Sequence, residues 1–210
     1  RDSGDDSKNV RAYLNGIIPG SEKDVRMAAF LETAPKAVNY LVQNSQVRLQ
    51  PVPFYPDYYP DHPGATTYGR VLEPEPFNAS VLGSKLNWLR LPLPEFVIFK
   101  DMMVARSDLA HFHRVFNSFA SFFVVAKLVF RHSIEKYRYG RGTSLVLGNA
   151  LVARFFASLL DADVTLETNK ITRSLILGEN GNVSGIEMVD GGCIGARFGV
   201  VLATGGFTHD

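Results

Sequence analysis

The stretch that decides the fold is Gly199-Val-Val-Leu-Ala-Thr-Gly-Gly-Phe207, a short apolar run that ends in a pair of glycines. An apolar run such as Val200 to Ala203, bounded by glycines, is typical of a strand buried on both faces in a parallel sheet. Gly205 and Gly206 lack a Cβ, so the backbone there can turn sharply and lie against a ligand. Ligands of open α/β sheets bind beyond the carboxyl ends of strands, where this glycine pair falls. The same pattern also suits an ordinary strand-to-loop turn.

The segment before this run is rich in β-forming residues. Residues 171–177, 183–189 and 193–203 have the composition of strands, and glycine-containing turns at 178–182 and 190–192 separate them. This spacing predicts a three-stranded antiparallel β-meander. A further short strand is expected at residues 163–166.

The first two thirds of the chain alternate helical patterns with irregular segments. The polar residues 1–20 are expected to form a flexible lead, and a helix is expected from Ser21. Pro35 should end that helix and start another, because proline suits the first turn of a helix but not its interior. Apolar residues at helical spacing predict one long helix over about 108–135 and another over about 148–160. Residues 47–52 alternate as a short strand would.

A proline-rich aromatic loop lies between these helices, with the sequence Phe54-Tyr-Pro-Asp-Tyr-Tyr-Pro-Asp-His-Pro-Gly64. Its prolines exclude a regular helix or a central strand. Fixed loops of this kind often carry binding surfaces, although a long loop can also simply cover a core.

Composition excludes several classes of partner. With 22 basic and 21 acidic residues the net charge is +1, which gives no reason to expect nucleic acid or an anionic membrane surface. No apolar run is long enough to span a membrane. The single cysteine, Cys193, cannot form an internal disulfide, which suits a reducing compartment and predicts a cytoplasmic protein. The histidines at 111, 113 and 132 lack partners at metal-ligand spacing, so no metal site is predicted.

The last part of the chain resembles the second half of the FAD domain of fumarate reductase-like flavoproteins. The shared order is a helix leading to a strand, then a small meander, then a strand that ends in Ala-Thr-Gly-Gly-Phe. The resemblance implies an α/β fragment whose helices pack on part of a Rossmann-like sheet, with FAD as cofactor. It places the glycine turn against the adenosine and pyrophosphate side of FAD. It also places the main chain just after the preceding strand, at Lys170 and Ile171, against the adenine. Residues 141–154 would pass near the flavin. The implied cofactor-binding residues are Gly148, Asn149, Lys170, Ile171, Ala203, Thr204, Gly205 and Gly206.

The middle of the chain narrows the resemblance to the 3-ketosteroid dehydrogenase branch of this family. The matching elements are Asp57-Tyr-Tyr-Pro60, Pro63-Gly64, Gly69-Arg70, Glu73-Pro74, Phe77-Asn78 and Leu82-Gly83. In ketosteroid Δ1-dehydrogenases the second tyrosine of the first motif helps to remove a proton from the steroid ring. The resemblance therefore implies a catalytic role for Tyr59 and a substrate-binding role for Tyr58. A phenol can relay a proton if its neighbours make it acidic enough. The alternative is that both tyrosines only pack, with their hydroxyls bonded to water.

Two parts of the family's pattern do not occur in these 210 residues: the glycine fingerprint that opens the FAD domain, and the catalytic cap domain that follows the glycine turn. The expected organisation is thus a partial FAD-binding domain. It has a flexible lead (1–20), a helical and loop insertion with a substrate-facing aromatic loop (21–145), and a segment with a helix, the meander and the Thr-Gly-Gly turn (146–210). Such a fragment is expected to be inactive alone and to self-associate through uncovered apolar faces.

The expected function is therefore that of a piece of an FAD-dependent oxidoreductase. It would dehydrogenate a cyclic ketone, with a 3-ketosteroid as the expected substrate class, and pass a hydride to flavin N5. One alternative is a fumarate reductase or succinate dehydrogenase-type flavoprotein, whose arginines and histidines would clamp a dicarboxylate. Another is a non-enzymatic module that binds a ligand on the aromatic loop.

Overall fold

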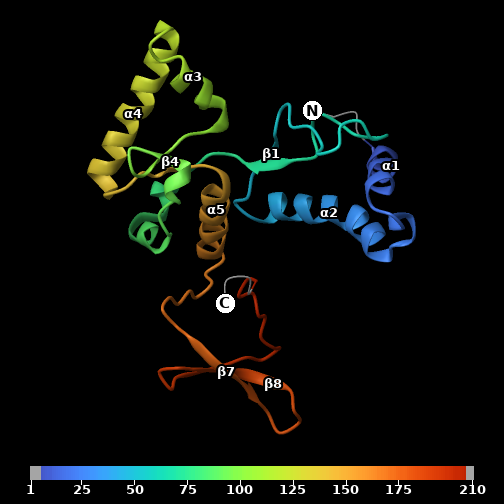
Figure 1. The fold of residues 1–210 in the computed structure, drawn as a ribbon. Helices are drawn as coiled ribbons and strands as arrows, with labels where there is room; N and C mark the ends of the chain where they lie inside the picture. Colours follow the sequence, from blue (N-terminus) through green and yellow to red (C-terminus); the bar gives the residue numbers. More distant parts are fainter. Residues whose placement is uncertain (1–5, 207–210) are drawn as a thin grey trace. The chain divides into compact units, whose positions relative to one another are not determined.

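The computed structural model describes residues 6–206 and divides the chain into two compact units (Figure 1). The first unit comprises Arg1–Val164 and the second comprises Thr165–Asp210. The start of the expected flexible lead, residues 1–5, and Phe207 of the glycine turn lie outside the described residues.

The chain begins with a helix where the sequence predicts a flexible lead. Helix α1 spans Ser7–Ile17, and the Asp6 carboxylate caps it by accepting the backbone N–H of Asn9 at 2.7 Å. Tyr13 is the buried residue of α1, so its aromatic side chain anchors this helix. The prediction of a flexible lead is therefore wrong for residues 7–17.

Helix α2 spans Val25–Asn44 and follows a short 3₁₀ turn, η1, at Ser21–Lys23. Its cap is Asp24, which accepts the N–H of Arg26 at 2.8 Å, so the helix begins at Val25 and not at Ser21. Pro35 lies inside α2 without ending it, contrary to the prediction of two helices. An interior proline costs about 3 kcal/mol or more. The ion pair between Glu32 and Lys36, 2.7 Å long, spans the proline on the helix surface and partly offsets this cost.

Three small two-stranded sheets connect the helices of the first unit, and all are antiparallel. The pairs are β1 (Leu49–Pro51) with β2 (Leu72–Pro74), β3 (Phe77–Asn78) with β6 (Ser144–Leu145), and β4 (Val97–Ile98) with β5 (Met102–Met103). The strand expected at 47–52 is present as β1. Residues 54–64 form neither helix nor strand, as predicted. Two 3₁₀ segments, η2 (Ala79–Trp88) and η3 (Pro94–Phe96), follow β3.

The Phe-rich segment forms a helical hairpin instead of the single long helix predicted over 108–135. A 3₁₀ turn, η4 (Arg106–Asp108), leads into α3 (Leu109–His113), and α4 follows at Phe119–Tyr139. The break falls at 114–118 because Ser118 caps α4, with its Oγ 3.4 Å from the donating N–H of Ser121. Helix α4 ends at Gly140, which has a left-handed φ of 74°.

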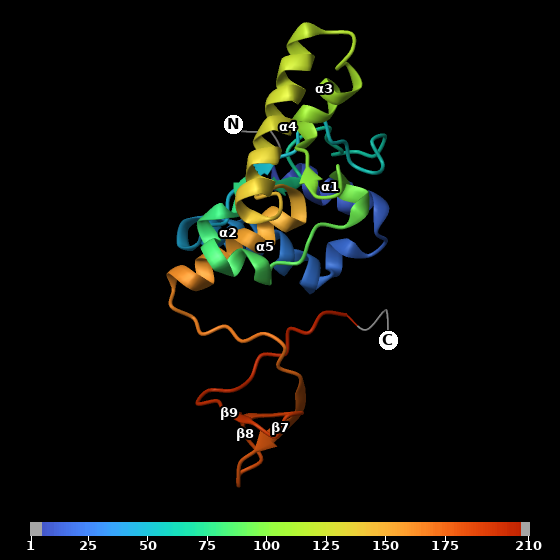
Figure 2. The same ribbon diagram turned by 90° about the vertical axis from the view of Figure 1, so that its left-hand side faces the viewer.

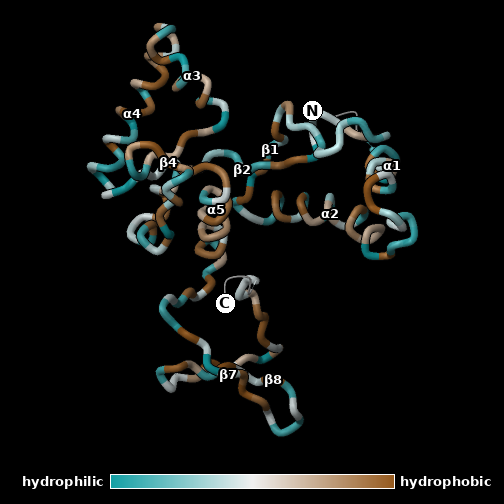
Figure 3. The backbone as a smooth tube through the Cα atoms, viewed as in Figure 1, coloured by the Kyte–Doolittle hydropathy of each residue, from teal (hydrophilic) through white to brown (hydrophobic). Residues whose placement is uncertain are grey.

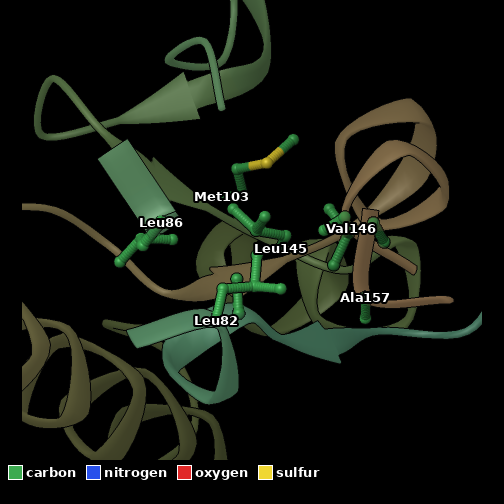
Figure 4. Close-up of a cluster of buried hydrophobic side chains, with 9 residues drawn as sticks. Leu82, Leu86, Met103, Leu145, Val146 and Ala157 are labelled. Atoms are coloured by element: carbon green, nitrogen blue, oxygen red, sulfur yellow. The ribbon is translucent and has the colours of Figure 1, made fainter. Parts of the chain in front are cut away.

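Helix α5 spans Leu147–Asp161, as predicted, and packs its small residues on the core of the first unit. Ala150, Ala153 and Ala157 recur on one face of α5 and contact η2 and the β3–β6 pair. The buried cluster also contains Ala79, Leu82, Leu86, Met103, Leu145 and Val146 (Figure 4). This core fixes the start of α5. Among residues 6–206, no helix is long and apolar enough to cross a membrane.

The second unit contains the predicted meander. Strands β7 (Thr172–Leu177), β8 (Val183–Met188) and β9 (Cys193–Gly195) form an antiparallel sheet in the order β7-β8-β9 (Figure 2). The strand expected at 163–166 does not form. Asp163 has a φ of 53° and the N–H of Val164 donates to Leu159 O at 3.0 Å, so these residues close the end of α5 instead.

The apolar run that opens the glycine turn is not a buried strand in this structure. Residues 199–206 form neither helix nor strand, and Val201 is 90% exposed. Figure 3 shows the hydrophobic colouring of the chain near its C-terminal end, beyond the β7–β8 sheet. A strand buried on both faces needs neighbouring strands and covering helices. The described part of the second unit offers this run only an antiparallel sheet of three strands, with which it does not pair. The prediction of a buried parallel strand is therefore wrong for this structure.

Candidate functional site

Tyr58 and Tyr59 lie in the tyrosine loop, which we define as residues 54–64. The side chain of Tyr58 is 89% exposed and that of Tyr59 is 56% exposed. The ring of Tyr59 meets the ring of His62 edge-on, with 5.7 Å between centroids. Its backbone N–H donates to the hydroxyl of Tyr13 in α1 at 3.2 Å. The structure thus fixes the backbone at Tyr59 and leaves both phenols accessible.

A mostly buried ion pair holds the tyrosine loop. Arg70 Nη1 lies 2.6 Å from Asp57 Oδ2, and Arg70 Nη2 donates to the carbonyl of Gly64 at 2.6 Å. Asp57 also accepts the N–H of Thr66 at 2.9 Å. The guanidinium of Arg70 lies over the ring of Tyr13, 5.3 Å from its centroid. One arginine therefore joins both ends of the loop to α1.

Gly64 of the tyrosine loop lies against the backbone of α1. Its φ is +78°, and a Cβ at this position would collide with the backbone carbonyl of Asn9. The sequence singles out Asp57, Gly64 and Arg70 only as markers of a family, and it gives no signal for Tyr13. Their shared role is to hold the backbone that carries Tyr59.

A cavity of about 580 Å³ lies between the β1–β2 pair and the start of α5. Its wall is mainly apolar, with Arg106 as a charged group that pairs with Glu73 at 3.4 Å and lies over the ring of Tyr55. The lining residues are Gln50, Pro51, Pro53, Tyr68, Glu73, Pro74, Pro76, Ala105, Arg106, Ser107, Val146 and Leu147. Such a cavity suits an apolar ligand that carries a few polar groups.

Gly148 and Asn149 lie in the first turn of α5. With Trp88, Leu89, Arg90 and Val152 they line a second cavity of about 320 Å³. The first N–H groups of a helix have no partner inside it, and no side chain of the described residues caps α5. Beyond its chain neighbours and the backbone of its own helix, a Cβ added at Gly148 would meet no described atom within 4 Å. This open, uncapped turn can accept a polar or anionic group of a cofactor such as FAD.

Arg141 fixes the segment that leads to α5. Its buried guanidinium donates to the carbonyls of Leu89 at 2.7 Å, Arg90 at 3.3 Å and Leu86 at 3.4 Å. Burial lowers the pKa of Arg141 from its usual value, while Asp101 acts in the opposite direction. The sequence shows Arg141 only as the start of a family-like segment.

The remaining predicted cofactor residues lie in the second unit. Lys170 Nζ pairs with Asp190 at 3.1 Å, and the carbonyl of Ile171 accepts the N–H of Val189 at 2.9 Å. Ala203, Thr204, Gly205 and Gly206 lie in the irregular, exposed segment after β9. Gly205 has a φ of +85°, and a Cβ added at Gly205 or Gly206 would meet no described atom within 4 Å beyond its chain neighbours. The backbone of this glycine turn is therefore open to a ligand.

No group of three or more His, Cys, Asp or Glu side chains that could hold a metal ion occurs within residues 6–206. His111 contacts Ser121, and His132 lies 3.2 Å from Asp101.

Comparison with known proteins gives consistent matches along the chain. It is 31% identical to 4-oxocyclohex-2-ene-1-carboxylate 5-dehydrogenase of Sinomonas cyclohexanicum over 98% of this chain and 35% of that protein. It is also 31% identical to 3-oxosteroid 1-dehydrogenase of Mycobacterium tuberculosis over 98% of this chain and 37% of that protein.

A solved structure shares the fold. The crystal structure of 3-ketosteroid delta1-dehydrogenase from Sterolibacterium denitrificans in complex with 1,4-androstadiene-3,17-dione matches with a TM-score of 0.71 and 28% identity. The match covers 90% of this chain and 34% of that one. The chain thus spans about a third of the length of the proteins it matches.

The family model described as FAD binding domain matches residues 1–210, the whole chain. This match confirms the resemblance drawn from the sequence, and FAD is the cofactor that it indicates. The uncapped start of α5 and the open glycine turn are compatible with such a cofactor. The chain therefore belongs to the family of FAD-binding domains.

Proposed function

We propose that this chain is part of the FAD-binding domain of a dehydrogenase that removes hydrogen from a cyclic ketone, with 3-ketosteroids as the substrate class. The observation that carries the proposal is the tyrosine loop, whose backbone is fixed while the phenols of Tyr58 and Tyr59 stay accessible. The printed activities of the relatives support it, since both 3-oxosteroids and 4-oxocyclohex-2-ene-1-carboxylate carry a ketone on a ring.

The proposed cofactor-binding residues offer mainly backbone groups to FAD. Gly148 and Asn149 offer the uncapped turn of α5, and Lys170 and Ile171 offer main-chain groups beside β7. Ala203, Thr204, Gly205 and Gly206 offer an open backbone. We further propose that α5 packs on a Rossmann-like sheet in the whole protein. FAD, when bound, supplies an acceptor for the hydride that leaves the substrate.

The proposed role of Tyr59 is to relay the proton that leaves the carbon beside the ketone. Dehydrogenation next to a ketone removes one proton and one hydride, and a phenol oxygen can take part in the proton step. Tyr58 would bind the substrate ring, since its exposed side chain offers an apolar face and a polar tip. The cavity of about 580 Å³, which borders the start of α5, is large enough for an apolar ring system.

The test uses the protein that carries this chain, purified and examined for the visible absorbance of bound flavin. Mixed without oxygen with a 3-ketosteroid that is saturated in its first ring, the flavin-loaded protein should bleach and release the 1-dehydro product. Parallel assays use 4-oxocyclohex-2-ene-1-carboxylate and, with a reductant, fumarate. Protein without flavin would overturn the cofactor assignment. Flavin-loaded protein that reduces fumarate but leaves both ketones unchanged would overturn the substrate class in favour of the dicarboxylate alternative.

A further inference from the structure

Glu135 is a buried carboxylate in α4 that does not belong to the hydrophobic core. Its Oε2 accepts the backbone N–H of Thr143 at 2.8 Å and that of Ser144 at 3.1 Å. Its Oε1 accepts the hydroxyl of Ser144 at 2.5 Å, and Arg131 Nε lies 3.5 Å away. A single charged group therefore satisfies three donors of one short segment.

A second carboxylate continues the same pattern. Asp101 Oδ2 accepts the backbone N–H of Gly142 at 3.3 Å, and Asp101 Oδ1 lies 3.0 Å from Lys136 Nζ. The consecutive N–H groups of residues 142, 143 and 144 are thus all held by acidic side chains. Gly142 fits tightly here, because a Cβ would lie 2.9 Å from the carbonyl of Asp101.

The other side of the segment is fixed as well. The carbonyl of Thr143 accepts the N–H of Ala79 at 2.8 Å, and Leu145 pairs with Phe77 across the β3–β6 sheet. Two residues later the chain enters α5 at Leu147, which has a positive φ of 52°. The direction of residues 142–146 therefore sets the direction in which the first turn of α5 points.

The charge on Glu135 is favoured despite its burial. Burial raises the pKa of this carboxyl, but the hydrogen bonds from the Ser144 hydroxyl and from the N–H groups of Thr143 and Ser144 lower it more, and Arg131 adds to them. The net result is a pKa below the usual value. Hydrogen bonds to a charged acceptor are also stronger and more directional than neutral ones.

We propose that Glu135 is a positioning residue for the cofactor-binding turn of α5: its carboxylate holds residues 143 and 144, and so directs Gly148 and Asn149 toward the cofactor. This inference rests on the proposed function, which assigns Gly148 and Asn149 to the cofactor. Glu135 acts through the backbone and does not line the cavity at Gly148. A leucine could fill the same volume, but it would leave the buried N–H groups of residues 143 and 144 without acceptors.

The experiment compares Glu135→Gln with Glu32→Gln in the protein that carries this chain. The amide of Glu135→Gln keeps the shape of the side chain but has one acceptor oxygen and no charge, while Glu32 is an exposed helical residue that serves as the matched control. Two quantities are measured: the amide hydrogen exchange of residues 141–149 in flavin-free protein, and the dissociation constant for FAD by flavin fluorescence.

We expect Glu135→Gln to speed exchange at residues 142–146 and to weaken FAD binding, each by about tenfold or more, because bonds to a charged group are lost. Glu32→Gln should change neither quantity. The proposal would be overturned if folded Glu135→Gln protein showed the wild-type rate of amide hydrogen exchange at residues 142–146 and the wild-type affinity for FAD. Faster exchange spread over the whole first unit would also overturn it, because this would reveal a general structural role.

Ser144→Ala provides a milder variant should Glu135→Gln fail to fold. It removes one of the three bonds and should raise exchange only within residues 142–146, with FAD binding weakened about threefold. Wild-type behaviour of Ser144→Ala would contradict the proposal. Wild-type protein that binds no FAD would refute the proposed function, while exchange in flavin-free protein would still decide whether Glu135 positions the segment.

Discussion

The hydroxyl of Tyr13 accepts a hydrogen bond from the backbone N–H of Tyr59 at 3.2 Å, which links α1 to a loop 46 residues further along the chain. The bond holds the main chain of Tyr59 and leaves its side chain 56% exposed. Arg70 strengthens the same junction, because it lies over the ring of Tyr13 and pairs with Asp57 of the loop. A catalytic phenol needs this combination of a fixed backbone and an accessible hydroxyl.

Tyr13→Phe should loosen this junction without unfolding the first unit. The change removes one hydrogen bond and leaves the ring beneath Arg70, so the free energy of unfolding should fall by about 1 kcal/mol. The exchange rate of the Tyr59 amide should rise. Tyr40→Phe, at an exposed position of α2, should change the free energy of unfolding by less than about 0.5 kcal/mol. Unchanged exchange at Tyr59 would show that the bond does not hold the loop.

Asp57→Asn should destabilise the first unit more than the loss of an exposed ion pair does. The side chains of Arg70 and Asp57 are only 16% and 13% exposed, so Asp57→Asn removes a charge-assisted bond from a largely buried site. The expected loss is about 1.5 to 3 kcal/mol in the free energy of unfolding, measured by denaturant titration. The comparison is Glu32→Gln, which breaks the exposed pair with Lys36 and should cost less than about 0.5 kcal/mol. Equal losses in the two variants would contradict this reasoning.

The sequence predicts those elements whose signal is local. The prolines of the tyrosine loop, the glycine turns of the meander and the apolar face of α5 each act over a few residues, and all three segments form as expected. The break at 114–118 is also marked locally, because Asn117 and Ser118 favour a helix cap, but the surrounding phenylalanines continue the helical pattern across it.

Features that depend on distant residues could not be predicted in the same way. Helix α1 is held by the contact of Tyr13 with residues 59 and 70, and nothing in the first residues reveals that contact. In the sequence, Glu135 has the features of an ordinary surface residue near the end of a helix. Its role depends on residues 143 and 144, whose N–H groups only the fold brings to its carboxylate. The run Val200 to Ala203 has the composition of a buried strand, yet strand pairing requires partners that the described part of its unit does not provide.

Acid should remove the stabilising effect of Glu135. The pKa of Glu135 in the folded state lies below its ordinary value of 4.5, so its contribution is fully present above about pH 4.5 and is lost as the pH falls through the folded pKa. The amide introduced by Glu135→Gln is neutral at every pH. The difference in free energy of unfolding between wild type and Glu135→Gln should therefore narrow as the pH falls from about 6 to about 3. Asp101, whose pKa is also lowered, is present in both proteins and cancels in the difference. A difference that stays constant with pH would contradict the ionised state of Glu135.

The 210-residue chain should associate with itself through exposed aromatic side chains. Phe116 and Phe119 at the turn of the α3–α4 hairpin are 95% and 88% exposed, and Phe123 lies nearby on α4. Exposed apolar surface of this kind promotes association. Light scattering should show an average molecular mass that rises with protein concentration. Replacing Phe116 and Phe119 with serine should make this rise smaller. A folded monomer at high concentration would refute this expectation.

Tyr59→Phe should lower turnover strongly while leaving the fold and flavin binding nearly unchanged. The substitution removes only the hydroxyl, so the bond from the backbone N–H to Tyr13 and the edge-on contact with His62 both persist. If the hydroxyl relays a proton, its loss should cost about a hundredfold in kcat, the usual range for general acid–base groups. Tyr58→Phe is the matched control in the same loop, and it should change both kcat and KM much less, since the ring proposed to bind the substrate is kept. The measurements are kcat and KM for a 3-ketosteroid, with flavin content and thermal midpoint as checks on integrity. If both variants turn over at the wild-type rate, Tyr59 only packs in the loop, and the proton relay must be sought elsewhere in the protein.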